Sequence, residues 1–165
     1  VAKMRRRHPH LFELGERERW ETLKARERPA GRGALAGLPA TLPDLLLAYR
    51  LQERAAGVGF DWPDTRGPLQ KVAEELAEVE AEIVIGTEDR EALTDEIGDL
   101  LFAVVNLARK AGVQPGTALD RANAKFRRRF ESIETIAAER GVVLGDATLE
   151  ELDVIWDEVK RNEGR

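Results

Sequence analysis

Apolar residues recur every three or four positions along two adjacent stretches of this 165-residue chain. They are Val72, Leu76, Val79 and Ile83 in the first stretch, and Leu93, Ile97, Leu100 and Val104 in the second. This spacing is typical of amphipathic helices, whereas the alternation that marks a β-strand is almost absent from the chain. The spacing therefore predicts two helices, over 68–85 and 88–111, that form an antiparallel hairpin with these residues on its buried faces.

Helix start and stop signals divide most of the remaining chain. They predict helices over 41–57, with Pro43 in its first turn, and over 115–140 and 149–162. Thr148 and Glu151 have the spacing of a capping box. Residues 2–8, with a continuation near 16–28, are a further helical segment, and the Gly- and Pro-rich residues 29–40 are typical of a linker. We predict an all-α fold, an up-and-down antiparallel helix bundle.

Composition narrows the class of protein. The chain has no cysteine, which excludes disulfides and thiolate metal sites, and no run of about 18 apolar residues that could span a bilayer. Residues 41–165 hold sixteen Lys and Arg against twenty-six Asp and Glu, which argues against general binding to nucleic acid. No secretory signal opens the sequence. We therefore expect a cytoplasmic protein that binds neither membranes nor nucleic acid.

Carboxylates occupy equivalent positions on the two hairpin helices. At about 100° per residue, Glu75 lies about 70° from the centre of its apolar face and Glu78 about 130°. Glu96 and Asp99 lie at the same two angles on the second helix. Antiparallel packing could bring the two pairs together, which would suit a hard divalent cation such as Mg²⁺. The alternative is that these residues are the solvated face of an acidic helix.

Iron is a less suitable metal than magnesium for this bundle. Di-iron bundles usually supply Glu-x-x-His pairs. The two histidines, His8 and His10, lie far from the hairpin in the basic start of the sequence. They are more typical of ordinary surface residues.

Four ordered segments resemble the MazG family. They are Gly59-Phe-Asp-Trp62, Lys71-x-x-Glu74-Glu-x-x-Glu78, Glu96-x-x-Asp99-Leu-Leu-Phe, and Arg121-Ala-Asn-x-Lys-Phe-x-x-Arg-Phe130. The resemblance covers about 41–162 and implies an all-α nucleoside triphosphate pyrophosphohydrolase. Such an enzyme releases the nucleoside monophosphate and pyrophosphate, after water attacks the α-phosphorus.

The resemblance also implies roles for individual residues. Mg²⁺, with Mn²⁺ as the alternative, would be held by Glu75, Glu78, Glu96 and Asp99, which form the catalytic centre. Glu74 belongs to the motif, but its position nearly opposite the apolar face suits a salt bridge or an outer-shell role better. The substrate contacts implied by the family are Lys71, Lys125, Arg129, Trp156 and Lys160. For Trp156, core packing is an equal alternative, and Phe60 and Trp62 are more typical of buried loop anchors than of base platforms.

An internal repeat links the two ends of the chain. Lys3-Met-Arg-Arg-Arg7 matches Lys125-Phe-Arg-Arg-Arg129, and Trp20 and Lys24 match Trp156 and Lys160. Longer members of the resembled family carry two similar domains. We therefore interpret residues 1–28 as the tail of a preceding repeat, 29–40 as a linker and 41–165 as the catalytic domain.

Related all-α pyrophosphohydrolases are usually oligomers, so we expect a homo-oligomer, most simply a dimer.

Two further classes of function stay open. A non-enzymatic module could use the carboxylates of the two hairpin helices to bind a basic partner protein. A third hypothesis keeps the enzyme but moves cleavage to the γ-phosphate, with release of orthophosphate.

Overall fold

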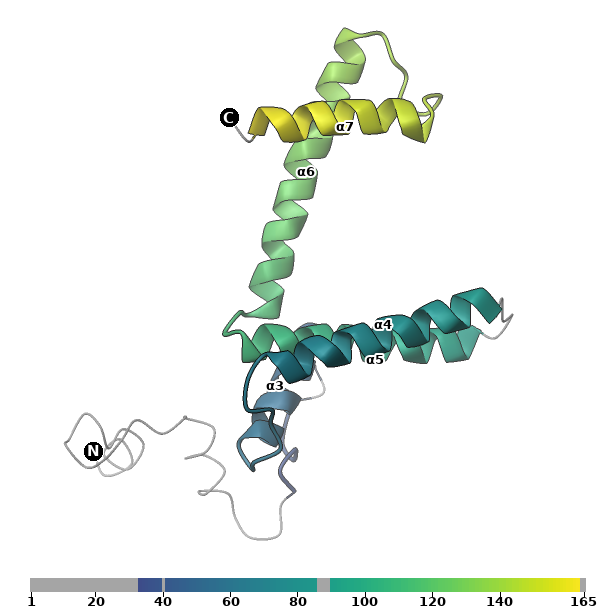
Figure 1. The fold of residues 1–165 in the computed structure, drawn as a ribbon. Helices are drawn as coiled ribbons and strands as arrows, with labels where there is room; N and C mark the ends of the chain where they lie inside the picture. Colours follow the sequence, from purple (N-terminus) through teal and green to yellow (C-terminus); the bar gives the residue numbers. More distant parts are fainter. Residues whose placement is uncertain (1–32, 40, 86–89, 164–165) are drawn as a thin grey trace, which may run out of the picture. The chain divides into compact units, whose positions relative to one another are not determined.

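The computed structural model describes residues 33–39, 41–85 and 90–163. Helices make up its regular structure, and these residues contain no β-strand, so the all-α prediction is confirmed. The helices are α3 (Asp44–Ala56), α4 (Arg66–Ile85), α5 (Arg90–Lys110), α6 (Pro115–Glu139) and α7 (Leu149–Glu163) (Figure 1). Residues 1–28, with the first copy of the predicted repeat, lie outside the described residues, as do residues 29–32 and 40 of the predicted linker.

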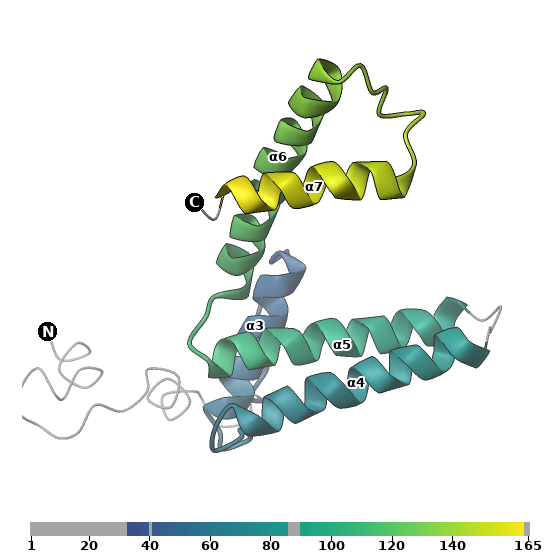
Figure 2. The same ribbon diagram turned by 45° about the horizontal axis from the view of Figure 1, so that its top comes forward.

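The chain divides into two compact units, one ending at Pro115 and the other beginning at Gly116. In the first unit, α4 and α5 lie side by side and antiparallel, as Figures 1 and 2 both show, and α3 packs against α5. A side-chain bond ties α3 to α5, because Gln52 Nε2 donates to the carbonyl oxygen of Phe102 at 2.8 Å. None of the described helices is long and apolar enough to cross a membrane.

The buried faces of the hairpin differ from the prediction. Val79 is buried, but Leu76, Ile83, Ile97 and Val104 are 46%, 61%, 43% and 44% exposed. Glu75, in contrast, is only 4% exposed. Helix α4 is therefore rotated relative to the prediction, so that Glu75 rather than Leu76 faces the rest of the unit. The ion pair with Lys71 allows the Glu75 carboxylate to be buried there.

Two helix starts also differ from the prediction. The first helix begins at Asp44, not Thr41, because Pro43 has an extended ψ of 139° and is the N-cap residue. Helix α4 begins at Arg66, two residues earlier than predicted, since Asp64 Oδ1 accepts the backbone N–H of Arg66 at 2.9 Å. The other predicted bounds agree to within two residues.

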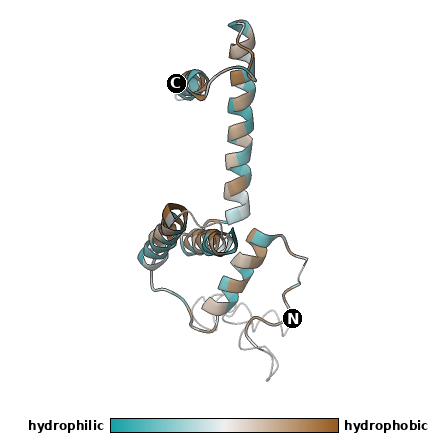
Figure 3. Ribbon diagram, turned by 90° about the vertical axis from the view of Figure 1, so that its right-hand side faces the viewer, coloured by the Kyte–Doolittle hydropathy of each residue, from teal (hydrophilic) through white to brown (hydrophobic). Residues whose placement is uncertain are grey.

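The second unit has a core of its own. Ile133 and Ala137 of α6 pack with Ile155 and Val159 of α7. Figure 3 shows polar and apolar residues mixed along the length of α6, as expected for a helix that buries one side only. Gly141, with a φ of 68°, ends α6, and the capping box is present at the start of α7. There Glu151 accepts the backbone N–H of Thr148 at 2.9 Å, and Thr148 accepts that of Glu151 at 3.3 Å.

Candidate functional site

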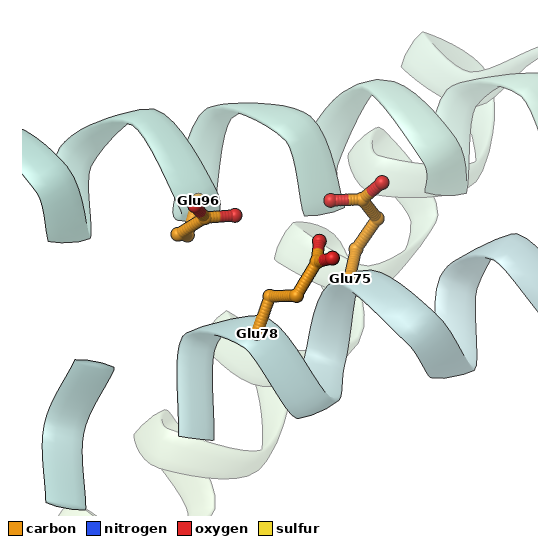
Figure 4. Close-up of side chains that lie close together, drawn as sticks. All are labelled: Glu75, Glu78 and Glu96. Carbon is orange, nitrogen blue, oxygen red and sulfur yellow. The ribbon is translucent and has the colours of Figure 1, made fainter. Parts of the chain in front are cut away.

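Three carboxylates meet between α4 and α5. Glu75 and Glu78 come from successive turns of α4, and Glu96 comes from the facing side of α5 (Figure 4). One oxygen from each lies within 4.8 Å of the other two. The i, i+3 spacing places the first two on one flank of α4, and the antiparallel register of the hairpin brings the third opposite. We call these three residues the acidic cluster.

Charge in the acidic cluster is only partly balanced. Lys71 Nζ lies 2.5 Å from Glu75 Oε1 and 2.7 Å from Glu74 Oε1. Its hydrogen bond lowers the pKa of Glu75. The hydrogen bond that a protonated Glu78 makes with Glu75 raises the pKa of Glu78, and the charge of Glu96 adds to this effect. Glu75 Oε2 is buried and has no donor while Glu78 is ionised. The cluster thus has a site for additional positive charge.

The donor set fits a hard divalent cation. Carboxylate oxygens are the ligands that Mg²⁺ and Ca²⁺ prefer. Oxygens bound to one Mg²⁺ at about 2.1 Å lie at most about 4.2 Å apart. A spread of up to 4.8 Å among the three oxygens therefore requires only small side-chain rotations to enclose such an ion. A bound cation would also supply the partner that the buried Glu75 oxygen lacks.

Asp99 and Lys71, two further predicted site residues, lie beside the acidic cluster. Asp99 is one turn after Glu96 on α5, but its carboxylate is not part of the three-residue group. It is exposed and, with Lys71 and Glu75, lines a pocket of about 470 Å³. Lys71 pairs with Glu74, which confirms the salt bridge predicted for Glu74, and it also pairs with Glu75. The hydrogen bonds to these two carboxylates raise the pKa of Lys71.

The other walls of this pocket are mostly apolar and aromatic. They come from α3, from the loop between α3 and α4, and from α5, and include Leu51, Ala55, Phe60, Trp62 and Phe102. Phe60 is 80% exposed, so the interpretation of this residue as a buried anchor is wrong. Trp62 rests against Gly67, where even a Cβ atom would approach the indole to 2.0 Å. The loop therefore presents two aromatic rings to the pocket.

A salt-bridge network holds this loop on the end of α5. Asp61 binds Arg109 at 2.5 Å and Lys110 at 2.9 Å, and the exposed fractions of the Asp61, Arg109 and Lys110 side chains are 13%, 7% and 7%. Burial opposes ionisation of Asp61, but the hydrogen bonds from Arg109 and Lys110 outweigh it and lower the pKa of Asp61 to about 2. Lys110 also donates to the Trp62 carbonyl. We call Asp61, Arg109 and Lys110 the Asp61 network.

Sequence reasoning missed the polar residues that line the pocket from α3 and α5. They are Gln52, Asn106 and Arg109. Gln52 and Asn106 are buried, and Asn106 Oδ1 accepts hydrogen bonds from Arg109 at 2.8 and 2.9 Å. A signal was available for Gln52, which interrupts an otherwise apolar row of Leu45, Ala48 and Ala55.

The remaining predicted substrate contacts lie in the second unit. Arg129 binds Glu163 at 2.7 Å, and its guanidinium lies 5.6 Å from the centre of the Trp156 ring. Trp156 also contacts Phe126, with ring centres 5.7 Å apart, and packs on the core of this unit. Core packing, one of the two alternatives for Trp156, is therefore observed for this half-buried side chain, whereas its contact with substrate stays a prediction.

Lys125 and Lys160 flank this aromatic group along their helices. Lys125 is one turn before Arg129 on α6 and is exposed. Lys160 is one turn after Trp156 on α7 and pairs with Asp157 at 2.6 Å. In the second unit, Arg129 and Trp156 are therefore in direct contact. Lys125 lies on the adjacent turn of α6, and Lys160 on the adjacent turn of α7.

Comparisons with known proteins identify the family of this chain. The family model of the MazG nucleotide pyrophosphohydrolase domain matches residues 66–133. The chain is 44% identical, over 98% of its length, to the nucleoside triphosphate pyrophosphohydrolase of Escherichia coli. It is 38% identical, over 96% of its length, to the nucleoside triphosphate pyrophosphohydrolase/pyrophosphatase MazG of Thermotoga maritima. The chain spans 65% and 62% of the lengths of these two relatives. With 44% identity along almost its whole length, the chain belongs to the MazG family.

Proposed function

We propose that this chain hydrolyses nucleoside triphosphates to the nucleoside monophosphate and pyrophosphate. The observation that carries the proposal is the acidic cluster, in which three carboxylates meet and one of them, Glu75, has a buried oxygen without a donor. The names of the two relatives support the choice of substrate and bond. A surface that only binds a basic protein would not require a buried, unpartnered carboxylate oxygen.

The cation that fits this cluster and the substrate is Mg²⁺, with Mn²⁺ as a substitute. Glu75, Glu78 and Glu96 would hold it, and Asp99 is the fourth ligand that we propose from its place one turn after Glu96. Bound Mg²⁺ supplies charge neutralisation to the phosphate oxygens. Lys71, which pairs with Glu75, would contact the same phosphates.

The reaction requires one bond to form and one to break. The oxygen of a water molecule bonds to the α-phosphorus, the bond between that phosphorus and the bridging α–β oxygen breaks, and pyrophosphate leaves. The water gives up one proton on attack, which a carboxylate of the acidic cluster would accept. The family resemblance implies further substrate contacts in the second unit, and we keep them as a prediction: Lys125, Arg129, Trp156 and Lys160.

The exposed apolar residues of the α4–α5 hairpin support a homodimer. They are Leu76 and Ile83 of α4, and Ile97, Leu101 and Val104 of α5, with Leu101 55% exposed. Large exposed apolar patches usually mark an interface. Light scattering of the wild type should give twice the monomer mass, and Ile83→Glu should give the monomer. A monomeric wild type would contradict the dimer.

Product analysis tests the proposed function. The chain is incubated with Mg²⁺ and each common nucleoside triphosphate, and the phosphate products are separated. We expect pyrophosphate and the monophosphate, and their loss in Glu78→Ala and Asp99→Ala with helical content unchanged. Orthophosphate and the diphosphate would mean cleavage at the γ-position. If the folded protein showed no turnover with any divalent metal, the proposal would fail in favour of an interaction module.

A further inference from the structure

The pocket beside the acidic cluster contains an unused hydrogen-bond acceptor. Gln52 is only 6% exposed and is part of the pocket wall. Its Nε2 donates to the Phe102 carbonyl at 2.8 Å. Because a carbonyl oxygen can only accept, this bond fixes which end of the Gln52 amide is nitrogen. The other end, Oε1, is buried and has no donor.

Such an oxygen calls for a partner that the isolated chain does not provide. Buried polar atoms are nearly always hydrogen-bonded, and an exception costs free energy until a donor reaches it. The other amide of the pocket wall is different, because Asn106 Oδ1 already accepts two bonds from Arg109. Arg109 is in turn held by Asp61. Gln52 Oε1 can therefore accept a hydrogen bond from a ligand, whereas Asn106 Oδ1 already accepts two within the protein.

The remaining walls indicate the chemistry of that ligand. Phe60, Trp62 and Phe102 provide aromatic surface, and Glu75 and Asp99 place the pocket directly beside the acidic cluster. A volume of about 470 Å³ lies in the range of small-molecule sites. A flat ring with N–H groups at its edge could stack on the aromatic walls and donate a hydrogen bond to Gln52 Oε1. A phosphate chain attached to that ring could reach the neighbouring cation site.

We infer that Gln52 reads the nucleobase, with its Oε1 accepting an N–H of the base of the bound triphosphate. This inference rests on the proposed function and extends it to a specificity-determining residue. The pocket then selects bases that carry an N–H donor at the edge facing α3. A base analogue without that donor leaves Gln52 Oε1 buried and unpaired, and so binds more weakly.

Binding of non-hydrolysable triphosphates tests the inference without relying on turnover. The α,β-methylene triphosphates of the four common nucleosides are titrated calorimetrically with Mg²⁺. The tightest binder is then compared with a matched analogue that lacks its N–H donor. The analogues are purine riboside for adenosine, 2-pyrimidinone riboside for cytidine, 3-methyluridine for uridine, and both inosine and 1-methylguanosine for guanosine. We expect the wild type to bind the analogue about tenfold more weakly or worse.

Variants assign this discrimination to Gln52. Gln52→Met keeps the length of the side chain but removes the acceptor, and should bind the base and its analogue within about twofold of each other. Gln70→Met, a matched change at an exposed position of α4, should discriminate like the wild type. Methyl triphosphate, which has no base, should bind equally to all three proteins. Circular dichroism checks their folding.

The outcomes separate this inference from the proposed function. Equal binding of base and analogue by the wild type would overturn the inference, as would full discrimination by Gln52→Met. If Gln52→Met does not fold, the wild-type comparison alone decides. Release of pyrophosphate with no base discrimination would leave the proposed function standing and remove the role of Gln52. Discrimination between base and analogue without any turnover would support the role of Gln52 and contradict the proposed function.

Discussion

The acidic cluster and the Asp61 network lie in the same helical unit but balance their charges differently. In the Asp61 network, one carboxylate is shared by two cations, all three side chains are nearly buried, and the pKa of Asp61 falls to about 2. In the acidic cluster, three carboxylates lie together, Lys71 pairs with only one of them, Glu75, and also with Glu74, and the pKa of Glu78 is raised.

The difference separates a structural role from a functional one. Buried charges are stable when they are paired, as in the Asp61 network, which fixes the aromatic loop on α5. Carboxylates that crowd together without enough cations destabilise the free protein, so their arrangement is explained by what they bind. Substitutions in the two clusters should accordingly affect different measurements.

Glu78→Gln should have the largest effect, and on activity rather than stability. Loss of a ligand to a cation that contributes several kcal/mol should lower the rate of pyrophosphate release by about 100-fold or more. The metal-free protein should unfold at the same or a higher temperature, because a repulsive charge is removed. Glu80→Gln, at an exposed position of α4, should keep wild-type activity. Equal activity of Glu78→Gln and Glu80→Gln would exclude Glu78 from the site.

Added Mg²⁺ should stabilise the wild type. A ligand at one hundred times its Kd stabilises the folded state by about 2.7 kcal/mol, which thermal unfolding with and without the metal can measure. Glu78→Gln should lose most of this increment, whereas Asp61→Asn should retain it. A similar increment in all three proteins would place the metal elsewhere.

Asp61→Asn should reduce stability directly. It leaves Arg109 and Lys110 nearly buried without a carboxylate, and the lowered pKa of Asp61 corresponds to about 2 kcal/mol at neutral pH. Urea unfolding measures this loss. Asp64→Asn, in the same loop but in an exposed pair with Arg66, should change stability much less than Asp61→Asn. Equal losses in the two variants would refute the special role of Asp61.

The advantage of the wild type over Asp61→Asn should depend on pH. The folded-state pKa of Asp61, about 2, is below its ordinary value of 3.8, so the folded state favours the ionised form. The difference in unfolding free energy should be complete above about pH 5 and should disappear as the pH falls toward 2. Urea titrations at several pH values measure it, and a constant difference would contradict the assignment.

Glu78 should show the opposite and smaller pH dependence. Its folded-state pKa is raised above the ordinary 4.5, so protonation favours the folded state. Without metal, the wild type should therefore gain stability relative to Glu78→Gln as the pH falls from neutral toward about 4.5. Thermal unfolding in a chelating buffer provides the measurement. A loss of relative stability over this range would show that the cluster is not repulsive.

Much of the α4–α5 hairpin could be predicted from the sequence, because its signals are local. Apolar spacing located both helices, and Gly112 and Gly141 marked two helix ends, where their φ angles are 73° and 68°. The equal offsets of Glu75 and Glu96 from the apolar rows also predicted that they would face each other. The rotation that buries Glu75 and exposes Leu76 could not be predicted, since it depends on the packing of α3 and α5.

The sequence by itself determined the helical class, the positions of the helices and the residues with the chemistry of a metal and phosphate site. These follow from periodicity, caps and residue type, which act over a few positions. Only the tertiary structure decided that Glu75, Glu78 and Glu96 meet while Asp99 stays outside the group, and that Asp61 is neutralised. The tertiary structure also buries Gln52 Oε1 without a hydrogen-bond donor. These properties depend on contacts between residues up to fifty positions apart, such as Gln52 with Phe102, whose distances no local pattern specifies.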